Sequence, residues 1–284
     1  MNARGFRLSA LRQFQIGGVS RLSLGGLRES PCCCSLPRHR KTPRSDLGVM
    51  LKGMRKEPYD VGSIVHVLKR GARGLHITGD EFDRVRFMKL LHYLNDEYVD
   101  DDWELNTRSM EEFCRPKAWP PKVPLVHVYA WVLMPNHFHL ILKEIRSDGV
   151  SKFMQKLCGS MTMHFNLKYQ EKGSIFQGPY KLRAVGTDRY FIYLAPYVMV
   201  KNVFELYPGG LINAAGDFEK AWKWANEEYR FSSLPEYTGR RQLPITHPDG
   251  PLMFDSPSQF KSSARDMIAG RAGEGVLHLA LEEA

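Results

Sequence analysis

The stretch Trp131–Lys143, WVLMPNHFHLILK, constrains the fold more than any other part of this 284-residue chain. Its pattern predicts one β-strand, a tight turn at 134–136, and a second strand that begins at His137. Because side chains alternate between the two faces of a strand, His137 and His139 share one face, and the apolar residues between and after them occupy the other. The stretch therefore predicts a hairpin with a buried apolar back and two imidazoles on its opposite side.

Two imidazoles on one rigid strand form half of a site for a divalent metal ion. The pattern His-x-His is short, and two histidines on a half-buried sheet face need no ligand at all. The pair alone therefore leaves both interpretations open.

The composition is that of an ordinary globular protein, with 43% hydrophobic and 25% charged residues. No apolar run approaches the roughly 20 residues that a membrane-spanning helix needs. The formal net charge is +9, but residues 1–49 contain nine basic and two acidic residues and so account for most of it. Nucleic-acid binding by the rest of the chain would therefore need a local basic face.

We divide the chain into a basic N-terminal segment (1–53) that we expect to be disordered, a central domain (54–210) and a C-terminal extension (211–284). Three interpretations of the first segment stay open: a transit peptide, a basic arm that touches DNA, and a translation start assigned too far upstream. Its adjacent cysteines, Cys32, Cys33 and Cys34, cannot bridge to one another without strain. Cysteine usage overall favours a reducing, cytoplasmic setting.

Hydrophobic periodicity predicts the order of strands and helices in the central domain. We expect strands at 63–70, 125–133, 137–143 and 181–185, helices at 80–97, 150–171 and about 187–206, and a long loop at 98–123. This βαβ-βαβ order predicts an α+β fold, a ferredoxin-like sandwich in which an antiparallel sheet carries helices on one face. The C-terminal extension should add two weak helices that pack on this core.

The last helix of the central domain carries Tyr190, Tyr193 and Tyr197 near one face. Packing into the core is the usual explanation for such a stripe. Pro196, however, removes a backbone donor inside the helix and predicts a kink just before Tyr197. A kink beside a polar site can aim a side chain into that site.

Five segments in this order resemble the single-tyrosine HUH transposases, most closely the group of REP-associated tyrosine transposases. These segments are VHVLKRG, VLMPNHFHLIL, SKFMQKL, GSIFQGPYK and DRYFIYLAPYVMVKN. The resemblance covers about residues 54–210. It implies the same ferredoxin-like sandwich and an enzyme that cuts and joins single-stranded DNA, usually beside an imperfect hairpin.

The resemblance also implies roles for individual residues. His137 and His139 would bind Mg²⁺ or Mn²⁺, and Tyr197 would be the nucleophile, because it opens a stretch similar to the family pattern Y-[IV]-x-x-N. A phenol, with a reference pKa of about 10, is a weak nucleophile at neutral pH, so a cation on the scissile phosphate would assist it. The tyrosine would then hold the 5′ phosphate and free a 3′ hydroxyl without a nucleotide cofactor.

One position departs from the family pattern. A polar ligand usually follows the tyrosine by four residues, where this chain has Lys201, and Asn202 comes one residue later. One residue turns an α-helix by about 100°. Either Pro196 or a π-bulge adjusts the helix so that Asn202 reaches the metal, or the third ligand is water or another group. Lys201 could then contact phosphate.

Basic residues mixed with aromatic ones suit a groove that follows a DNA backbone and offers stacking platforms. Any one of these residues could equally be a solvated side chain. The candidates are Lys69, Arg70, Arg73, Lys152, Lys156, Tyr180, Lys181, Arg183 and Lys201.

These features lead to one main hypothesis, a metal-dependent single-stranded DNA endonuclease and strand transferase that acts through a 5′-phosphotyrosine. We expect a hairpin-bearing DNA partner, no membrane partner, and either a monomer or a homodimer. One alternative is a non-catalytic DNA-hairpin binding protein derived from such an enzyme. Another is that the histidines are polar groups of the sheet without any ligand.

Overall fold

The computed structural model of the protein describes residues 59–108 and 113–270. The predictions for the N-terminal segment, including its three adjacent cysteines, lie outside the described residues. The same is true of the last part of the C-terminal extension. Among the helices of the described ranges, none is long and apolar enough to cross a membrane.

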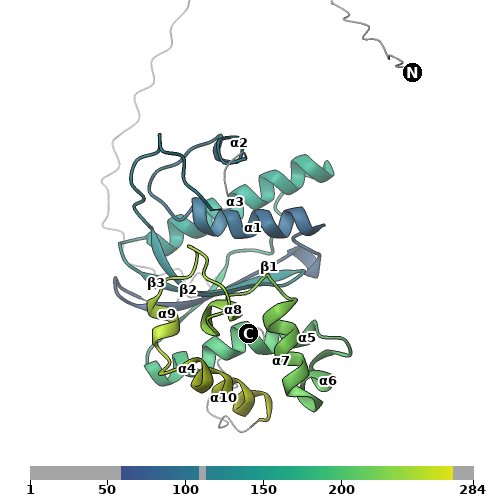
Figure 1. Ribbon diagram of the computed structural model, residues 1–284. Helices are drawn as coiled ribbons and strands as arrows, with labels where there is room; N and C mark the ends of the chain where they lie inside the picture. The colour runs from purple at the N-terminus through teal and green to yellow at the C-terminus, as the bar shows by residue number, and fades with distance from the viewer. Residues whose placement is uncertain (1–58, 109–112, 271–284) are drawn as a thin grey trace, which may run out of the picture. The chain divides into compact units, whose positions relative to one another are not determined.

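Four strands form one antiparallel sheet (Figure 1). The strands are β1 (Ile64–Arg70), β2 (Val126–Leu133), β3 (His137–Glu144) and β4 (Lys181–Val185). Their order across the sheet is β2-β3-β1-β4, and every neighbouring pair is antiparallel. The predicted α+β fold with an antiparallel sheet is therefore confirmed, and β3, which carries both histidines, lies in the interior of the sheet.

Two helices cover the apolar side of the hairpin. They are α1 (Glu81–Tyr93) and α3 (Gly149–Tyr169), and Figure 1 shows them together on one side of the sheet. Phe138, Leu140 and Leu142 from β3 pack into this layer and are fully buried. Asp80 caps α1, since its side chain accepts a hydrogen bond of 3.0 Å from the backbone N–H of Asp83.

The opposite face of the sheet is also covered, so the prediction of helices on one face is wrong. The last helix of the central domain crosses this face as α4 (Asp188–Pro196), a π-helical turn η2 (Tyr197–Lys201) and α5 (Asn202–Glu205). The physical reason is that the histidine side of β2 and β3 also carries apolar residues, including Val132 and Ile141, which are fully buried against these helices.

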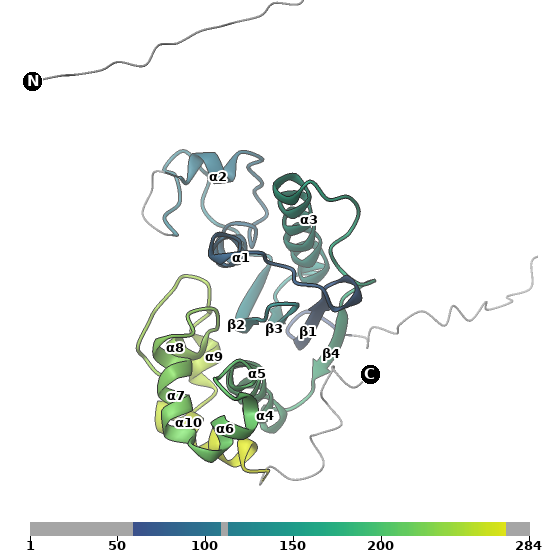
Figure 2. The same ribbon diagram turned by 90° about the vertical axis from the view of Figure 1, so that its right-hand side faces the viewer.

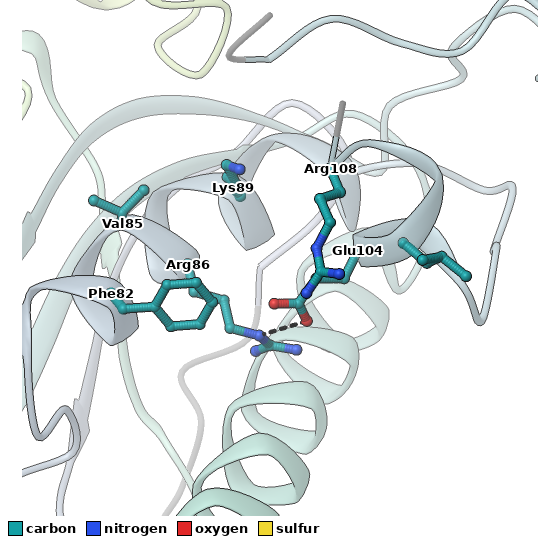
Figure 3. Close-up of a pocket in the computed structure, with 7 residues that line it drawn as sticks. Phe82, Val85, Arg86, Lys89, Glu104 and Arg108 are labelled. Atoms are coloured by element: carbon teal, nitrogen blue, oxygen red, sulfur yellow. Dashed lines mark hydrogen bonds and ion pairs between the residues drawn. The ribbon is translucent and has the colours of Figure 1, made fainter. Parts of the chain in front are cut away.

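The C-terminal extension completes this second layer (Figure 2). Up to residue 270, where the described range ends, it has five short helices rather than two: α6 (Gly210–Gly216), α7 (Phe218–Glu227), α8 (Leu234–Tyr237), α9 (Asp249–Leu252) and α10 (Pro257–Ile268). The segment predicted as a long loop contains one further short helix, α2 (Trp103–Asn106). The histidine face of the sheet therefore lies beneath helices and is largely closed to solvent.

Candidate functional site

The paired histidines lie side by side on β3, as the alternation of the strand predicted. Their ring centroids are 5.0 Å apart at an interplanar angle of 76°. His137 is 8% exposed and His139 is fully buried. Both imidazoles are therefore held on the sheet face that the last helix covers.

A hydrogen-bond partner fixes the Nδ1 atom of each ring. Nδ1 of His137 lies 2.7 Å from Oδ1 of Asn136, and Nδ1 of His139 lies 2.9 Å from Nε2 of His66. Ligand histidines are commonly oriented in this way by a second group on the other ring nitrogen. Nε2 is therefore the nitrogen with which each ring would bind a metal ion.

His66 is a member of this cluster that the sequence reasoning did not single out. It is fully buried on β1, and its ring stacks on that of His139 with centroids 5.1 Å apart and an angle of 17°. Its signal in the sequence is weak, because one histidine in a strand has many possible neighbours. Only the pairing of β1 with β3 places it beside His139.

The last helix brings Tyr197 to the histidines. The tyrosine ring meets the His139 ring edge-on, with centroids 6.2 Å apart and an angle of 82°. Tyr197 is 7% exposed, so its ring is enclosed between the helix and the sheet. Tyr190 and Tyr193 are only partly buried, which distinguishes Tyr197 within the stripe of three tyrosines.

The π-helical turn determines which residue lies one helical turn after Tyr197. The backbone N–H of Asn202 donates to the carbonyl of Tyr197, which closes a turn one residue longer than that of an α-helix. Asn202, rather than Lys201, therefore lies one turn beyond the tyrosine. The turn begins directly after Pro196, where the proline lacks the backbone N–H that a regular α-helix would use.

Asn202 is a fully buried amide inside this turn. Its Nδ2 donates a long hydrogen bond of 3.4 Å to the carbonyl of Val198, and its Oδ1 has no hydrogen-bond partner within the part of the chain that the structure describes. A buried acceptor without a partner costs free energy unless a ligand or water satisfies it. Two imidazole nitrogens and one such amide oxygen fit a divalent cation, and the oxygen favours Mn²⁺ or Mg²⁺.

Lys201 lies beside the tyrosine rather than one turn beyond it. Its Nζ is 5.1 Å from the centroid of the Tyr197 ring and forms an ion pair of 2.6 Å with Glu205. The side chain is 22% exposed. This position puts a positive charge next to the phenol.

Three further basic residues share the histidine face. Strand pairing sets Arg70 opposite His137 and Arg183 opposite His66, and residues paired directly across two strands point to the same face. Lys181 on the edge strand β4 joins them by the same register. Four of the predicted DNA-binding residues, these three and Lys201, are therefore gathered around the histidine pair.

Another group of the predicted DNA-binding residues lies on the other side of the sheet. Lys69 is 7% exposed, its Nζ donates to the carbonyl of Gly178, and burial lowers its pKa. Lys156 likewise donates from α3, to the carbonyl of Asp96. These contacts give both lysines a role in holding loops to the core.

The other candidates are Tyr180, Lys152 and Arg73. The Tyr180 hydroxyl is 3.2 Å from the hydroxyl of Ser151 on α3, and Lys152 is an exposed residue of the same helix. Arg73 is exposed in the turn after β1, with a φ of 55°.

The fold and the site define an α+β protein in which paired histidines face a tyrosine. Residues 122–201 match the family model described as "Transposase IS200 like". This match confirms the resemblance seen in the sequence and shows that residues 122–201 are similar to IS200-like transposases. The segment includes His137, His139 and Tyr197 and ends directly before Asn202.

One solved structure with similarity to the chain is that of a REP-associated tyrosine transposase bound to a REP hairpin. The identity is 15% and the TM-score 0.36, and the alignment covers 69% of this chain and 90% of the other. No curated protein matches the chain.

Proposed function

We propose that this protein is a metal-dependent enzyme that nicks and rejoins single-stranded DNA through Tyr197. The observation that carries the proposal is the ring contact of 6.2 Å between Tyr197 and His139 inside a segment that matches IS200-like transposases. Hairpin-bearing DNA is the substrate that the family resemblance implies. The basic residues on the histidine face are suited to its phosphates.

In the proposed reaction the phenol oxygen of Tyr197 attacks the scissile phosphorus. A bond forms between that oxygen and phosphorus as the bond from phosphorus to the 3′ oxygen breaks, and the phenol proton ends on the 3′ oxygen. The products are a 5′-phosphotyrosine and a free 3′ hydroxyl. Reversal by another 3′ hydroxyl would rejoin DNA, because the phosphotyrosine ester retains the free energy of the broken bond.

The residues around Tyr197 would bind the metal ion, orient its ligands and stabilise negative charge. His137, His139 and Asn202 would hold Mg²⁺ or Mn²⁺, which when bound supplies positive charge against the phosphate oxygens. His66 and Asn136 would keep the two imidazoles oriented. Lys201 lies beside the nucleophile Tyr197, and Arg70 lies opposite the proposed ligand His137. Both would offset the negative charge that develops on the phosphate during the reaction.

The proposal is tested with the full chain, Mn²⁺ and a panel of single-stranded DNAs that contain hairpins. We expect a covalent protein–DNA adduct that peptide mapping assigns to Tyr197 and that Tyr197→Phe abolishes. Tyr193→Phe is the matched control, because it removes a hydroxyl from the same helix, and it should keep the adduct. An adduct that survives in Tyr197→Phe, or none with any substrate, would contradict the proposal.

The burial of the site favours a second candidate, a non-catalytic protein that binds DNA hairpins. Tyr197 and both histidines are at most 8% exposed, and a strand of DNA must reach the tyrosine for cleavage. This candidate predicts binding that weakens with salt, no cleavage, and an affinity for hairpins that His137→Ala leaves unchanged.

A further inference from the structure

A second group of metal-ligand side chains lies at the other end of the sheet. His127 on β2, and His247 and Asp249 from the C-terminal extension, offer ligand atoms that all lie within 4.8 Å of one another. The strand register pairs His127 with Lys143 at the end of β3, six residues from His137. At about 3.3 Å per residue this separates the two groups by roughly 20 Å.

The donor atoms of this cluster suit a transition metal. Nδ1 of His247 lies 3.6 Å from Oδ2 of Asp249 and accepts a hydrogen bond of 3.3 Å from the Asp249 backbone N–H, so this nitrogen carries a lone pair. Nδ1 of His127 is buried and has no hydrogen-bond partner among the described residues. Two neutral imidazoles and one carboxylate form a common ligand set for zinc and related ions.

The backbone around the cluster holds these side chains in place. The His247 N–H donates to the carbonyl of Val128 at 2.7 Å, which ties the loop to β2. Gly250 directly follows Asp249 in α9, and a Cβ there would lie 2.6 Å from the carbonyl oxygen of Tyr129, so only glycine lets this segment approach β2 so closely. The register of β2 shifts between Val128 and Ala130, and bulges of this kind commonly re-aim side chains near functional sites.

An outer partner positions the carboxylate. The hydroxyl of Tyr129, the residue at the bulge, donates to Oδ2 of Asp249 at 3.4 Å. Hydrogen bonds of this type orient the ligands in known metal centres. The site is also accessible, because the side chains of His247 and Asp249 are 31% and 49% exposed and a cavity of about 600 Å³ adjoins both histidines.

The two imidazoles now lie face to face, with centroids 3.6 Å apart and an angle of 9°. Lone pairs of imidazoles lie in the ring planes, so both rings can bind one ion only if the stack opens. The cavity beside them provides room for the exposed ring of His247 to rotate. The protein would supply three ligands, and water from the cavity would complete a tetrahedral set.

We propose that His127, His247 and Asp249 form a second metal site, which binds a zinc-class ion and fastens the C-terminal extension to β2. The site uses no residue of the proposed DNA-cleaving centre. Its ligands come from two parts of the chain that are distant in sequence, so a bound ion would stabilise the packing of the extension on the sheet.

The test is a Zn²⁺ titration of the full chain against a chromophoric chelator, in a parent variant that removes competing ligands: His139→Ala with Cys32, Cys33 and Cys34 changed to Ser. We expect the parent to bind Zn²⁺ with a rise in melting temperature. His127→Ala and Asp249→Asn should each weaken that binding at least tenfold and remove the rise. His76→Ala, which changes an exposed histidine outside the cluster, is the matched control and should match the parent.

Substitution of Co²⁺ gives a second measurement that does not depend on stability. Bound Co²⁺ should show the intense visible absorption of a tetrahedral site in the parent and lose it in Asp249→Asn, which keeps the size of the side chain. Unchanged Zn²⁺ affinity in both ligand variants would overturn the proposal. Equal Zn²⁺ affinity in the parent and in a variant that combines His127→Ala with Asp249→Asn would also overturn it. That result is expected of an adventitious ion only.

Discussion

At the scale of single residues, His66 determines how His139 can act. The bond of 2.9 Å between Nε2 of His66 and Nδ1 of His139 is buried, so water cannot easily replace either partner. If Nδ1 of His139 is the donor, then Nε2 carries the lone pair that a metal needs. His66 is thus a positioning residue for the proposed metal ligand.

His66→Phe should weaken Mn²⁺ binding by about 10- to 100-fold, because the aromatic stack is kept but the hydrogen bond is lost. His66→Gln, which can still accept a hydrogen bond, should restore part of the affinity. Isothermal titration with Mn²⁺ measures both variants. Equal affinities in His66→Phe and the unmodified protein would show that the bond does not orient His139.

At the scale of elements, the π-helical turn decides the register of the last helix. One extra residue in the turn moves Asn202 to the place where an α-helix would put Lys201. Lys201 is directed instead to Glu205 and to the ring of Tyr197. The amide and the ammonium group therefore have separate roles, although they are adjacent in sequence.

Exchange of these two residues tests the register. The double variant Lys201→Asn/Asn202→Lys keeps the composition of the helix but moves the amide out of its place and puts a charge in a buried position. We expect Mn²⁺ affinity to fall at least as far as in Asn202→Ala, whereas Lys201→Ala should bind Mn²⁺ like the unmodified protein. Unchanged Mn²⁺ affinity in Asn202→Ala would exclude Asn202 as a ligand.

A second feature at this scale is a group of hydrogen bonds that joins α1 to α3. The carboxylate of Asp83 is buried and accepts hydrogen bonds from Lys168 and Tyr169, and it also contacts His164 on α3. Burial alone would raise the pKa of this carboxyl, but bonds from Lys168, the Gly79 N–H, Tyr169 and His164 together lower it. The ionised form therefore stabilises the folded state.

Asp83→Asn should lower the free energy of unfolding by about 1.5–3 kcal/mol at pH 7. Because the folded pKa is lowered, the contribution of Asp83 is fully present above the unfolded value of about 3.9 and is lost as pH falls below it. Urea unfolding at pH 7 and pH 3 measures the effect, and the gap between variant and unmodified protein should narrow at pH 3. A gap that stays constant would show that the charge is not responsible.

At the scale of the whole molecule, the C-terminal extension forms part of the core on the histidine face. Phe260 on α10 is fully buried, and its ring packs against Trp222, Tyr237 and Phe254. The same apolar cluster includes Val198 and other residues of the π-helical turn. The extension therefore supports the helix that carries Tyr197.

Phe260→Ala should lower the free energy of unfolding by about 3–5 kcal/mol, because it removes a fully buried ring and leaves a cavity. Leu252→Ala is the control, since that side chain is 76% exposed, and it should change stability by less than about 0.5 kcal/mol. Urea denaturation measures both. A small effect of Phe260→Ala would mean that the extension is not part of one cooperative core.

Local patterns were enough to predict much of this protein. Strand alternation placed His137 and His139 on one face, and the order of elements predicted the antiparallel α+β sheet. The predicted bounds of all four strands agree with the structure to within about two residues. These features depend on neighbours in the chain, so the sequence contains the information directly.

The tertiary structure alone decided the remainder, because it depends on contacts between distant segments. Strand pairing selected His66 as the partner of His139 and separated Arg70, Lys181 and Arg183 from the lysines on the other face. The last helix and the extension pack on the second face of the sheet, although helices were predicted on one face only. The π-helical turn places Asn202 one turn beyond Tyr197. The sequence left this arrangement as one of several alternatives, because it depends on how a proline-interrupted helix packs on the sheet.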